Sequence, residues 1–169
     1  MGGVWQPAYI GLGSNLEDPR AQVSRALERL GTLEGVYLAL CSPLYGSRPL
    51  GRADQPDFVN AVAGVLTELE PLALLHTLRE LERSFGRPAA RERWGPRILD
   101  LDLLVHGRER RADAELTLPH PGLAQRSFVL YPLAEIAPDL DVPGLGRVSA
   151  LKARVAAEAV WRLDDRRAA

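Results

Sequence analysis

The chain has 169 residues but only one cysteine, Cys41. A single cysteine excludes an internal disulfide and fits a reducing compartment, so we expect a cytoplasmic protein. The sequence also lacks any apolar run of about 18 residues, the length that a membrane-spanning helix needs. No basic segment leads into an apolar one near the start, so no signal peptide is expected. These absences exclude a disulfide scaffold and argue against a membrane partner.

Excess charge is also missing, because 21 basic and 22 acidic residues give a formal net charge of -1. This balance argues against a nucleic-acid partner. The basic residues are nearly all arginine, and Lys152 is the only lysine. Arginine suits phosphates and carboxylates, although a bias in genomic composition explains the same excess. The P-loop pattern G-x-x-x-x-G-K-[S/T] is absent, which excludes a P-loop kinase.

The residues that are present predict one globular domain over residues 1–169, with an apolar fraction of 46%. Short apolar or β-branched segments predict strands at 8–12, 36–45, 58–69 and 98–106. The Gly-rich stretch at 11–15 is expected to turn the chain after the first strand.

Capping residues and apolar stripes predict the helices. Asp18 and Pro19 open the first helix and Gly31 ends it. Pro71 opens the second helix and Gly86 closes it. The buried face of this second helix is expected to hold Leu74, Leu75, Leu78, Leu81 and Phe85. A last helix is expected near 149–163.

The element order β-α-β-β-α-β is that of the ferredoxin-like unit, an antiparallel sheet with two helices on one face. We therefore predict an α+β protein with a ferredoxin-like βαββαβ core. The remaining third of the chain is expected to add a C-terminal helical elaboration.

Two aspartates interrupt the apolar strand at 98–105. Alternation predicts that Leu99, Leu101, Leu103 and Val105 share one face, while Asp100, Asp102 and Leu104 share the other. Two carboxylates this close are stable with a cation between them, and Mg²⁺ suits such oxygen ligands. The structural alternative is a solvated strand face on which each aspartate pairs with an arginine.

Arginines just upstream favour the metal site. Arg91, Arg93 and Arg97 precede the aspartates in a loop that contains Gly95 and Pro96. Guanidinium groups facing a dicarboxylate metal site form a clamp for a polyphosphate. The residues alone thus favour phosphoryl or nucleotidyl transfer.

The segment RWGPRILDLDLL at 93–104 resembles the signature of 6-hydroxymethyl-7,8-dihydropterin pyrophosphokinases, enzymes of folate biosynthesis. Further blocks at 9–16, 49–61 and 116–138 are similar to this family in order and spacing. The resemblance implies transfer of pyrophosphate from ATP to the hydroxymethyl group of the pterin, giving AMP. It also implies two Mg²⁺ ions on Asp100 and Asp102, and it adds Arg87 and Arg97 as catalytic residues.

The resemblance also implies the binding residues. ATP is expected to contact Glu82, Trp94, Arg97, Leu103, Thr117, His120 and Arg126. The pterin is expected to contact Ser47, Leu50, Phe58, Asn60, Trp94, Asp100 and Phe128. Within the second set, Phe58 and Phe128 would sandwich the ring, and Asn60 would read its amide edge.

Several of these residues have a structural alternative. Glu82 fits a pairing with Arg79 or Arg83 on its own helix, and Arg126 fits a helix cap or a surface charge. Trp94 fits a loop anchor, His120 a turn residue that bonds the backbone, and Asn60 a cap at a strand edge.

Some positions depart from the family pattern. Pro121 follows the histidine where many members have an aromatic residue, and Phe58 stands where many have tyrosine. The basic residue that many members carry two positions after Arg87 is missing, and Arg91 is the candidate substitute.

Two other functions stay open on the residues alone. One is a different metal-dependent nucleotidyltransferase, and the other is a module that binds nucleic acid or a small ligand on an open sheet. The partners expected of the leading prediction are ATP and the pterin, with no membrane or nucleic acid, and the chain is expected to be a monomer. The loops at 46–56 and 86–97 are expected to close over the nucleotide.

Overall fold

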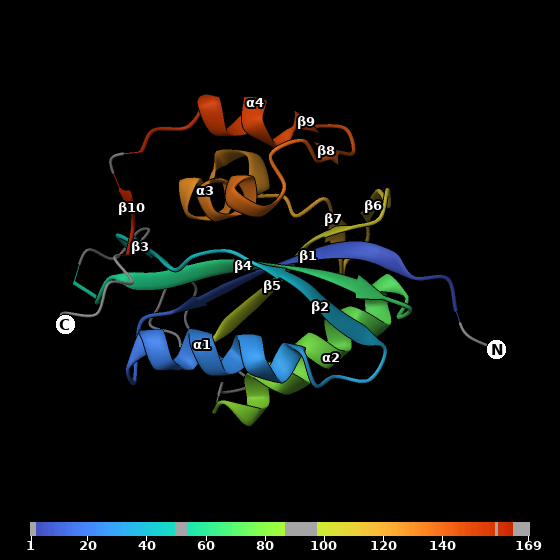
Figure 1. The fold of residues 1–169 in the computed structure, drawn as a ribbon, viewed down its shortest axis with the longest axis horizontal. Helices are drawn as coiled ribbons and strands as arrows, with labels where there is room; N and C mark the ends of the chain where they lie inside the picture. Colours follow the sequence, from blue (N-terminus) through green and yellow to red (C-terminus); the bar gives the residue numbers. More distant parts are fainter. Residues whose placement is uncertain (1–2, 50–53, 87–97, 158, 164–169) are drawn as a thin grey trace.

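The computed structural model describes residues 3–49, 54–86, 98–157 and 159–163. An antiparallel sheet forms the middle layer, and helices cover both of its faces (Figure 1). Its strands are β1 (Gln6–Ser14), β2 (Val36–Cys41), β3 (Tyr45–Ser47), β4 (Phe58–Thr67), β5 (Asp100–His106) and β10 (Val160–Arg162). The order along the sheet is β10-β3-β4-β1-β5, and β2 also pairs with β4. The α+β class with an antiparallel sheet is therefore confirmed.

Helices α1 (Pro19–Leu30) and α2 (Pro71–Ser84) lie together on one face of the sheet (Figure 1). The first helix starts as its sequence predicts, because the Asp18 carboxylate accepts a hydrogen bond of 3.4 Å from the Ala21 amide. Gly31 is its C-cap residue. The local capping pattern is enough to place this helix.

The predicted leucine face of α2 is also confirmed. Leu74, Leu75, Leu78 and Leu81 are buried in the core between the helices and the sheet, and Phe85 packs against that core half-buried. The chain leaves the helix at Gly86, whose φ of 92° is in the left-handed region that favours glycine.

A second apolar core lies on the opposite face of the sheet. Helices α3 (Ser127–Ile136) and α4 (Val148–Ala153) cover this face (Figure 1). The core joins Val62 and Leu104 of the sheet to Leu130 and Leu133 of α3 and Leu151 of α4. Two short hairpins, β6 (Arg111–Ala112) with β7 (Thr117–Leu118) and β8 (Asp141–Val142) with β9 (Gly146–Arg147), flank these elements.

The strand expected at 36–45 is instead two strands with a break at 42–44. Ser42 makes the break, since its amide donates to the Val62 carbonyl and its hydroxyl accepts from the Val62 amide, each at 2.9 Å. Pro43 follows and has no amide proton for the ladder. As a result β2 pairs with the second half of β4 and β3 with its first three residues.

The prediction of a helix near 149–163 is also wrong over most of this range. Helix α4 ends at Ala153, and the chain then returns as β10 to pair with β3 (Figure 1). Val160 lies opposite Ser47 in this pairing. Without β10, this edge of β3 would leave backbone N–H and C=O groups unpaired, and the segment can pair with them only as a strand.

Strand β5 departs from simple alternation at one residue. Tyr9 pairs with Val105 and Ile10 with Leu103, so a bulge falls at Leu104. Leu99, Leu101 and Leu103 join the core beneath α1 and α2 as predicted, whereas Val105 joins Leu104 in the core beneath α3. The predicted face of Val105 is wrong because the bulge reverses the alternation there.

The glycine-rich stretch at 11–15 is not a turn over most of its length, because Gly11 to Ser14 are the last four residues of β1. No helix within the described part of the chain is long and apolar enough to cross a bilayer.

Candidate functional site

The two aspartates of β5 stand on the sheet face that α3 partly covers. Gly13 of β1 pairs with Asp100 on one side and with Asn60 of β4 on the other. Residues directly opposite in antiparallel strands point to the same face. Asp100, Gly13 and Asn60 therefore form one row across three strands. Asp102 lies on the same face, two residues further along β5.

A cavity of about 260 Å³ lies beside β5, the edge strand of the sheet. It is lined by six of the residues expected to form the site: Glu82, Asp100, Asp102, Leu103, Thr117 and His120. Helix α2, strand β5, the segment leading into β7 and the turn after β7 supply its walls. The structure thus brings most of the expected nucleotide side together around the two aspartates.

Glu82 has a structural role at this cavity. Its side chain is 1% exposed, and one carboxylate oxygen accepts a hydrogen bond of 2.7 Å from the amide of Leu101. Leu101 stands between the two aspartates. Glu82 therefore ties α2 to the part of β5 that carries them.

His120 lies in the turn after β7 and lines the cavity. Its Nδ1 accepts a hydrogen bond of 3.0 Å from the Gly122 amide, so the proton of the neutral ring is on Nε2. This Nε2 lies 4.0 Å from a carboxylate oxygen of Asp102. Burial, followed by the positive charge of Arg126, lowers the pKa of His120 to about 4, although Asp100 acts in the opposite direction. His120 is thus a neutral N–H donor at neutral pH, and it also makes the backbone bond of the structural alternative.

Arg126 stands at the N-cap of α3, where its carbonyl accepts hydrogen bonds from the amides of Val129 and Leu130, each at 3.0 Å. Its guanidinium lies 5.8 Å from the ring centre of Phe128. The Arg126 side chain makes no capping hydrogen bond, so only its backbone takes part in the helix start, and its guanidinium lies over an aromatic ring of the predicted pterin side.

Asn60 and Ser47 form a buried polar pair on the neighbouring strands β4 and β3. The Asn60 side-chain amide donates a hydrogen bond of 2.7 Å to the Ser47 hydroxyl, and the two residues are 4% and 3% exposed. Phe58 is half-buried two residues before Asn60, on the same face of β4. The structure therefore places three of the expected pterin residues near one end of the row.

Four expected site residues, Leu50, Arg87, Trp94 and Arg97, lie outside the described residues, as do Arg91 and Arg93.

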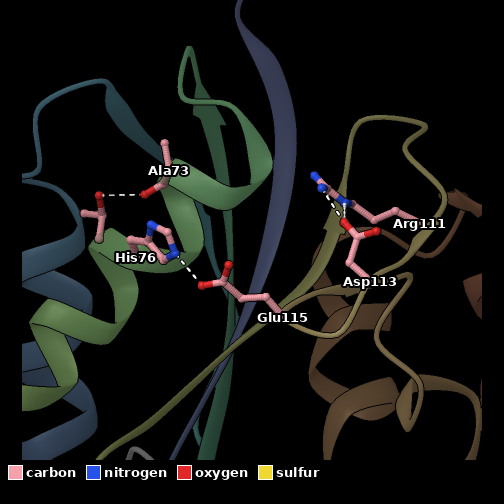
Figure 2. Close-up of polar contacts among 6 residues, drawn as sticks. Ala73, His76, Arg111, Asp113 and Glu115 are labelled. Atoms are coloured by element: carbon pink, nitrogen blue, oxygen red, sulfur yellow. Dashed lines mark hydrogen bonds and ion pairs between the residues drawn. The ribbon is translucent and has the colours of Figure 1, made fainter.

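The sequence does not predict two polar contacts that each involve a residue lining the cavity (Figure 2). His76 of α2 contacts Glu115 through Nε2 and Oε2 at 2.5 Å, and the Arg111 Nε donates to Asp113 at 2.7 Å. Glu115 and Asp113 line the cavity. His76 and Glu115 are 39 residues apart in the chain, so no local pattern pairs them.

The donor set at the cavity fits Mg²⁺ bound together with a substrate. The described residues contain no cluster of three or more histidine, cysteine or acidic side chains that could hold a metal without other ligands. Mg²⁺ typically takes one or two protein carboxylates and completes its shell with water and substrate phosphates. Asp100 and Asp102 supply such a pair.

The fold and the site together define an α+β protein with an acidic cavity at the edge of an antiparallel sheet. The chain belongs to the 7,8-dihydro-6-hydroxymethylpterin-pyrophosphokinase family, whose model matches residues 9–138. It is therefore an enzyme of the pyrophosphokinase class.

Two relatives carry the name 2-amino-4-hydroxy-6-hydroxymethyldihydropteridine pyrophosphokinase. The protein from Haemophilus influenzae is 49% identical over 136 residues, which cover 80% of this chain and 84% of that protein. The protein from Pseudomonas aeruginosa is 46% identical over 159 residues, which cover 94% of this chain and 97% of that protein.

Solved structures support the fold. A Plasmodium falciparum HPPK-DHPS protein, crystallised with pterin and p-hydroxybenzoate, superposes with a TM-score of 0.71 at 13% sequence identity. The match covers 94% of this chain and 47% of the solved chain. The present chain thus spans about half of that solved chain, and the likeness concerns the fold alone.

Proposed function

We propose that the protein transfers pyrophosphate from ATP to 6-hydroxymethyl-7,8-dihydropterin, giving AMP and the pterin diphosphate, as a Mg²⁺-dependent step of tetrahydrofolate biosynthesis. The observation that carries the proposal is the row formed by Asn60, Gly13 and Asp100, beside a cavity lined by Asp102 and His120. The substrates in this proposal are those that membership of the pyrophosphokinase family indicates.

The reaction joins the hydroxymethyl oxygen of the pterin to the β-phosphorus of ATP. The bond between that phosphorus and the oxygen bridging to the α-phosphate breaks, AMP leaves with this oxygen, and the hydroxyl proton passes to solvent. Two Mg²⁺ ions held by Asp100 and Asp102 would neutralise phosphate charge and lower the pKa of the attacking hydroxyl.

The residues of the cavity act by positioning and by stabilising charge. His120 donates its Nε2 proton to a phosphate oxygen, because the Gly122 amide and the low pKa of the ring keep it neutral with the proton on this atom. Glu82 holds the two aspartates in place through the Leu101 amide. Thr117 and the backbone of Leu103 bind the adenine and ribose, and both line the cavity.

The pterin lies over the sheet near Asn60. Asn60 reads the amide edge of the ring, Phe58 and Phe128 stack on its faces, and Ser47 orients Asn60. The resemblance of the sequence adds further contacts outside the described residues. We assign Arg87, Arg97 and Trp94 to closure over the triphosphate, and Leu50 to the pterin.

The sheet order β5-β1-β4-β2, with α1 and α2 on one face, supports a ferredoxin-like core. Under this proposal α3, α4 and β10 form the C-terminal elaboration of a single domain over residues 1–169. We further propose that the enzyme acts as a cytoplasmic monomer, which fits its single cysteine.

An assay of AMP formation from ATP tests the function. The wild-type protein should form AMP only when both the pterin and Mg²⁺ are present, with the pterin diphosphate as the second product. Asp102→Asn should lower kcat/KM by about 100-fold or more, because one carboxylate is lost at the phosphate site. Asp139→Asn, at a side chain that is 88% exposed beyond α3, is the matched control and should retain activity within twofold.

The reaction products distinguish the proposed pyrophosphate transfer from nucleotidyl transfer, the competing function. Release of pyrophosphate together with a nucleotidyl adduct would identify a nucleotidyltransferase instead. Full activity of Asp102→Asn would contradict the proposed metal site.

A further inference from the structure

Gly13 is the middle residue of the row that joins the two ends of the proposed pterin site. It pairs with Asn60 of β4 and with Asp100 of β5. Neighbouring strands are about 4.8 Å apart, so Asn60 and Asp100 are separated by about 10 Å across β1. A ligand that contacts both residues must therefore cross the sheet face directly above Gly13.

The fold itself does not require a glycine at this position. The backbone of Gly13 has no positive φ, in contrast to Gly35, Gly86 and Gly107. A methyl group built on Gly13 would lie 3.4 Å from the Asn60 side-chain oxygen and 3.8 Å from a ring carbon of Phe58. These are ordinary van der Waals contacts, so alanine would fit without moving its neighbours.

A glycine inside a strand carries a cost, because it has no side chain to pack and loses more entropy on folding. Such a glycine often marks the place where a ligand approaches the backbone closely. The neighbours of Gly13 agree with this explanation. The missing side chain would point between Asn60 and Phe58, two residues that we assign to the pterin.

We propose that Gly13 is a specificity-determining residue whose missing side chain leaves the floor of the pterin site open. This inference rests on the proposed function. A flat bicyclic ring can then lie against β1, with its amide edge at Asn60 and its hydroxymethyl arm at Asp100. A methyl group on Gly13 would lift the ring from the sheet and separate one of its ends from its partner. The nucleotide cavity, which Gly13 does not line, would be unaffected.

Gly11 provides a matched control on the same strand. It lies two residues before Gly13 on the same face and also has no positive φ. The three atoms nearest to a methyl group on Gly11 would all belong to the side chain of Leu104, at 3.6–3.8 Å. Gly11 pairs with Asp102 of β5, as Gly13 pairs with Asp100. Gly11→Ala therefore adds the same methyl group to the same strand opposite an aspartate, but next to Leu104 instead of next to Asn60.

The experiment measures binding of 6-hydroxymethyl-7,8-dihydropterin by titration calorimetry, in the presence of Mg²⁺ and a non-hydrolysable ATP analogue. Gly13→Ala should weaken pterin binding by tenfold or more, and Gly13→Val should weaken it further. In both variants the Kd of the ATP analogue should stay within twofold of wild type. Gly11→Ala, whose methyl group lies next to Leu104 and not next to Asn60, should keep the pterin affinity within twofold.

Two results would overturn the inference while leaving the proposed function intact. One is a folded Gly13→Ala that binds the pterin as tightly as wild type does. The other is a Gly13→Ala that fails to fold by circular dichroism, because the glycine would then serve the fold and not the ligand. A wild-type protein that binds no pterin would overturn the proposed function, and this inference would fail with it.

Discussion

At the residue scale, His120 combines a structural bond with a position beside the acidic cavity. The Gly122 amide occupies its Nδ1, and its Nε2 faces Asp102 at 4.0 Å. Burial and the charge of Arg126 hold its pKa at about 4, well below the ordinary value of 6.5. The folded protein therefore keeps this ring neutral under conditions in which the unfolded chain would protonate it.

This difference predicts a pH dependence of stability. The contribution of His120 is fully present above pH 6.5 and is lost as the pH falls toward 4, because only the unfolded chain binds a proton in this window. Between pH 7.5 and pH 5.0 the loss should be about 2 kcal/mol. Urea unfolding in EDTA measures it, and His120→Gln should remove that part of the pH dependence. Parallel curves for wild type and His120→Gln would contradict the neutral state of the ring.

At the scale of elements, one buried carboxylate joins α2 to β5. Glu82 accepts the Leu101 amide proton at 2.7 Å from a position that is 1% exposed. The contact between His76 and Glu115, which lines the cavity, also joins this helix to the segment that leads into β7 (Figure 2). Helix α2 thus holds the cavity wall at two points.

Replacement of Glu82 should therefore affect both stability and activity. Glu82→Ala leaves the buried Leu101 amide without this acceptor and should cost about 2–3 kcal/mol of unfolding free energy. It should also lower kcat, because β5 carries the two aspartates. Glu82→Gln retains an acceptor oxygen and should lose less of both. Glu80→Ala, at an exposed position of the same helix, is the control for helix propensity and should change neither by much. Equal effects of Glu82→Ala and Glu82→Gln would argue against the hydrogen bond as the cause.

At the scale of the whole molecule, the sheet is covered on both faces (Figure 1). Leu78 belongs to the core beneath α1 and α2, and Leu130 to the core beneath α3. Both side chains are 0% exposed. Strand β1 connects the cores, because Ile10 faces the first and Tyr9 packs against the second. The site row lies on the α3 side, so the second core supports the site directly.

Truncation in either core should destabilise the protein by a similar amount. Leu78→Ala and Leu130→Ala should each cost about 2–5 kcal/mol of unfolding free energy. Leu66→Ala, at a side chain that is 39% exposed on the sheet, should cost less than about 1 kcal/mol. Guanidinium unfolding followed by circular dichroism and tryptophan fluorescence measures these values. If the transitions seen by the two probes coincided in one of these leucine variants and separated in the other, the two faces of the sheet would unfold independently.

Local patterns in the sequence were enough for several parts of this protein. Asp18, Pro19 and Gly31 set the ends of α1, and the leucine spacing set the buried face of α2. Alternation correctly placed Asp100 and Asp102 on one face of β5, opposite Leu101 and Leu103. These predictions succeed because helix and strand periods, and the chemistry of caps, depend on residues a few positions apart.

Only the tertiary structure decided the features that join distant segments. The bulge that turns Val105 to the second core depends on the register of β5 against β1. The pairing of β10 with β3 depends on an edge that lies more than a hundred residues earlier in the chain. The low pKa of His120 depends on burial by its surroundings. Gly13 looked like part of a turn in the sequence, and only its two strand partners place it between Asn60 and Asp100. Register and burial are set by partners far along the chain, and no local pattern of residues contains that information.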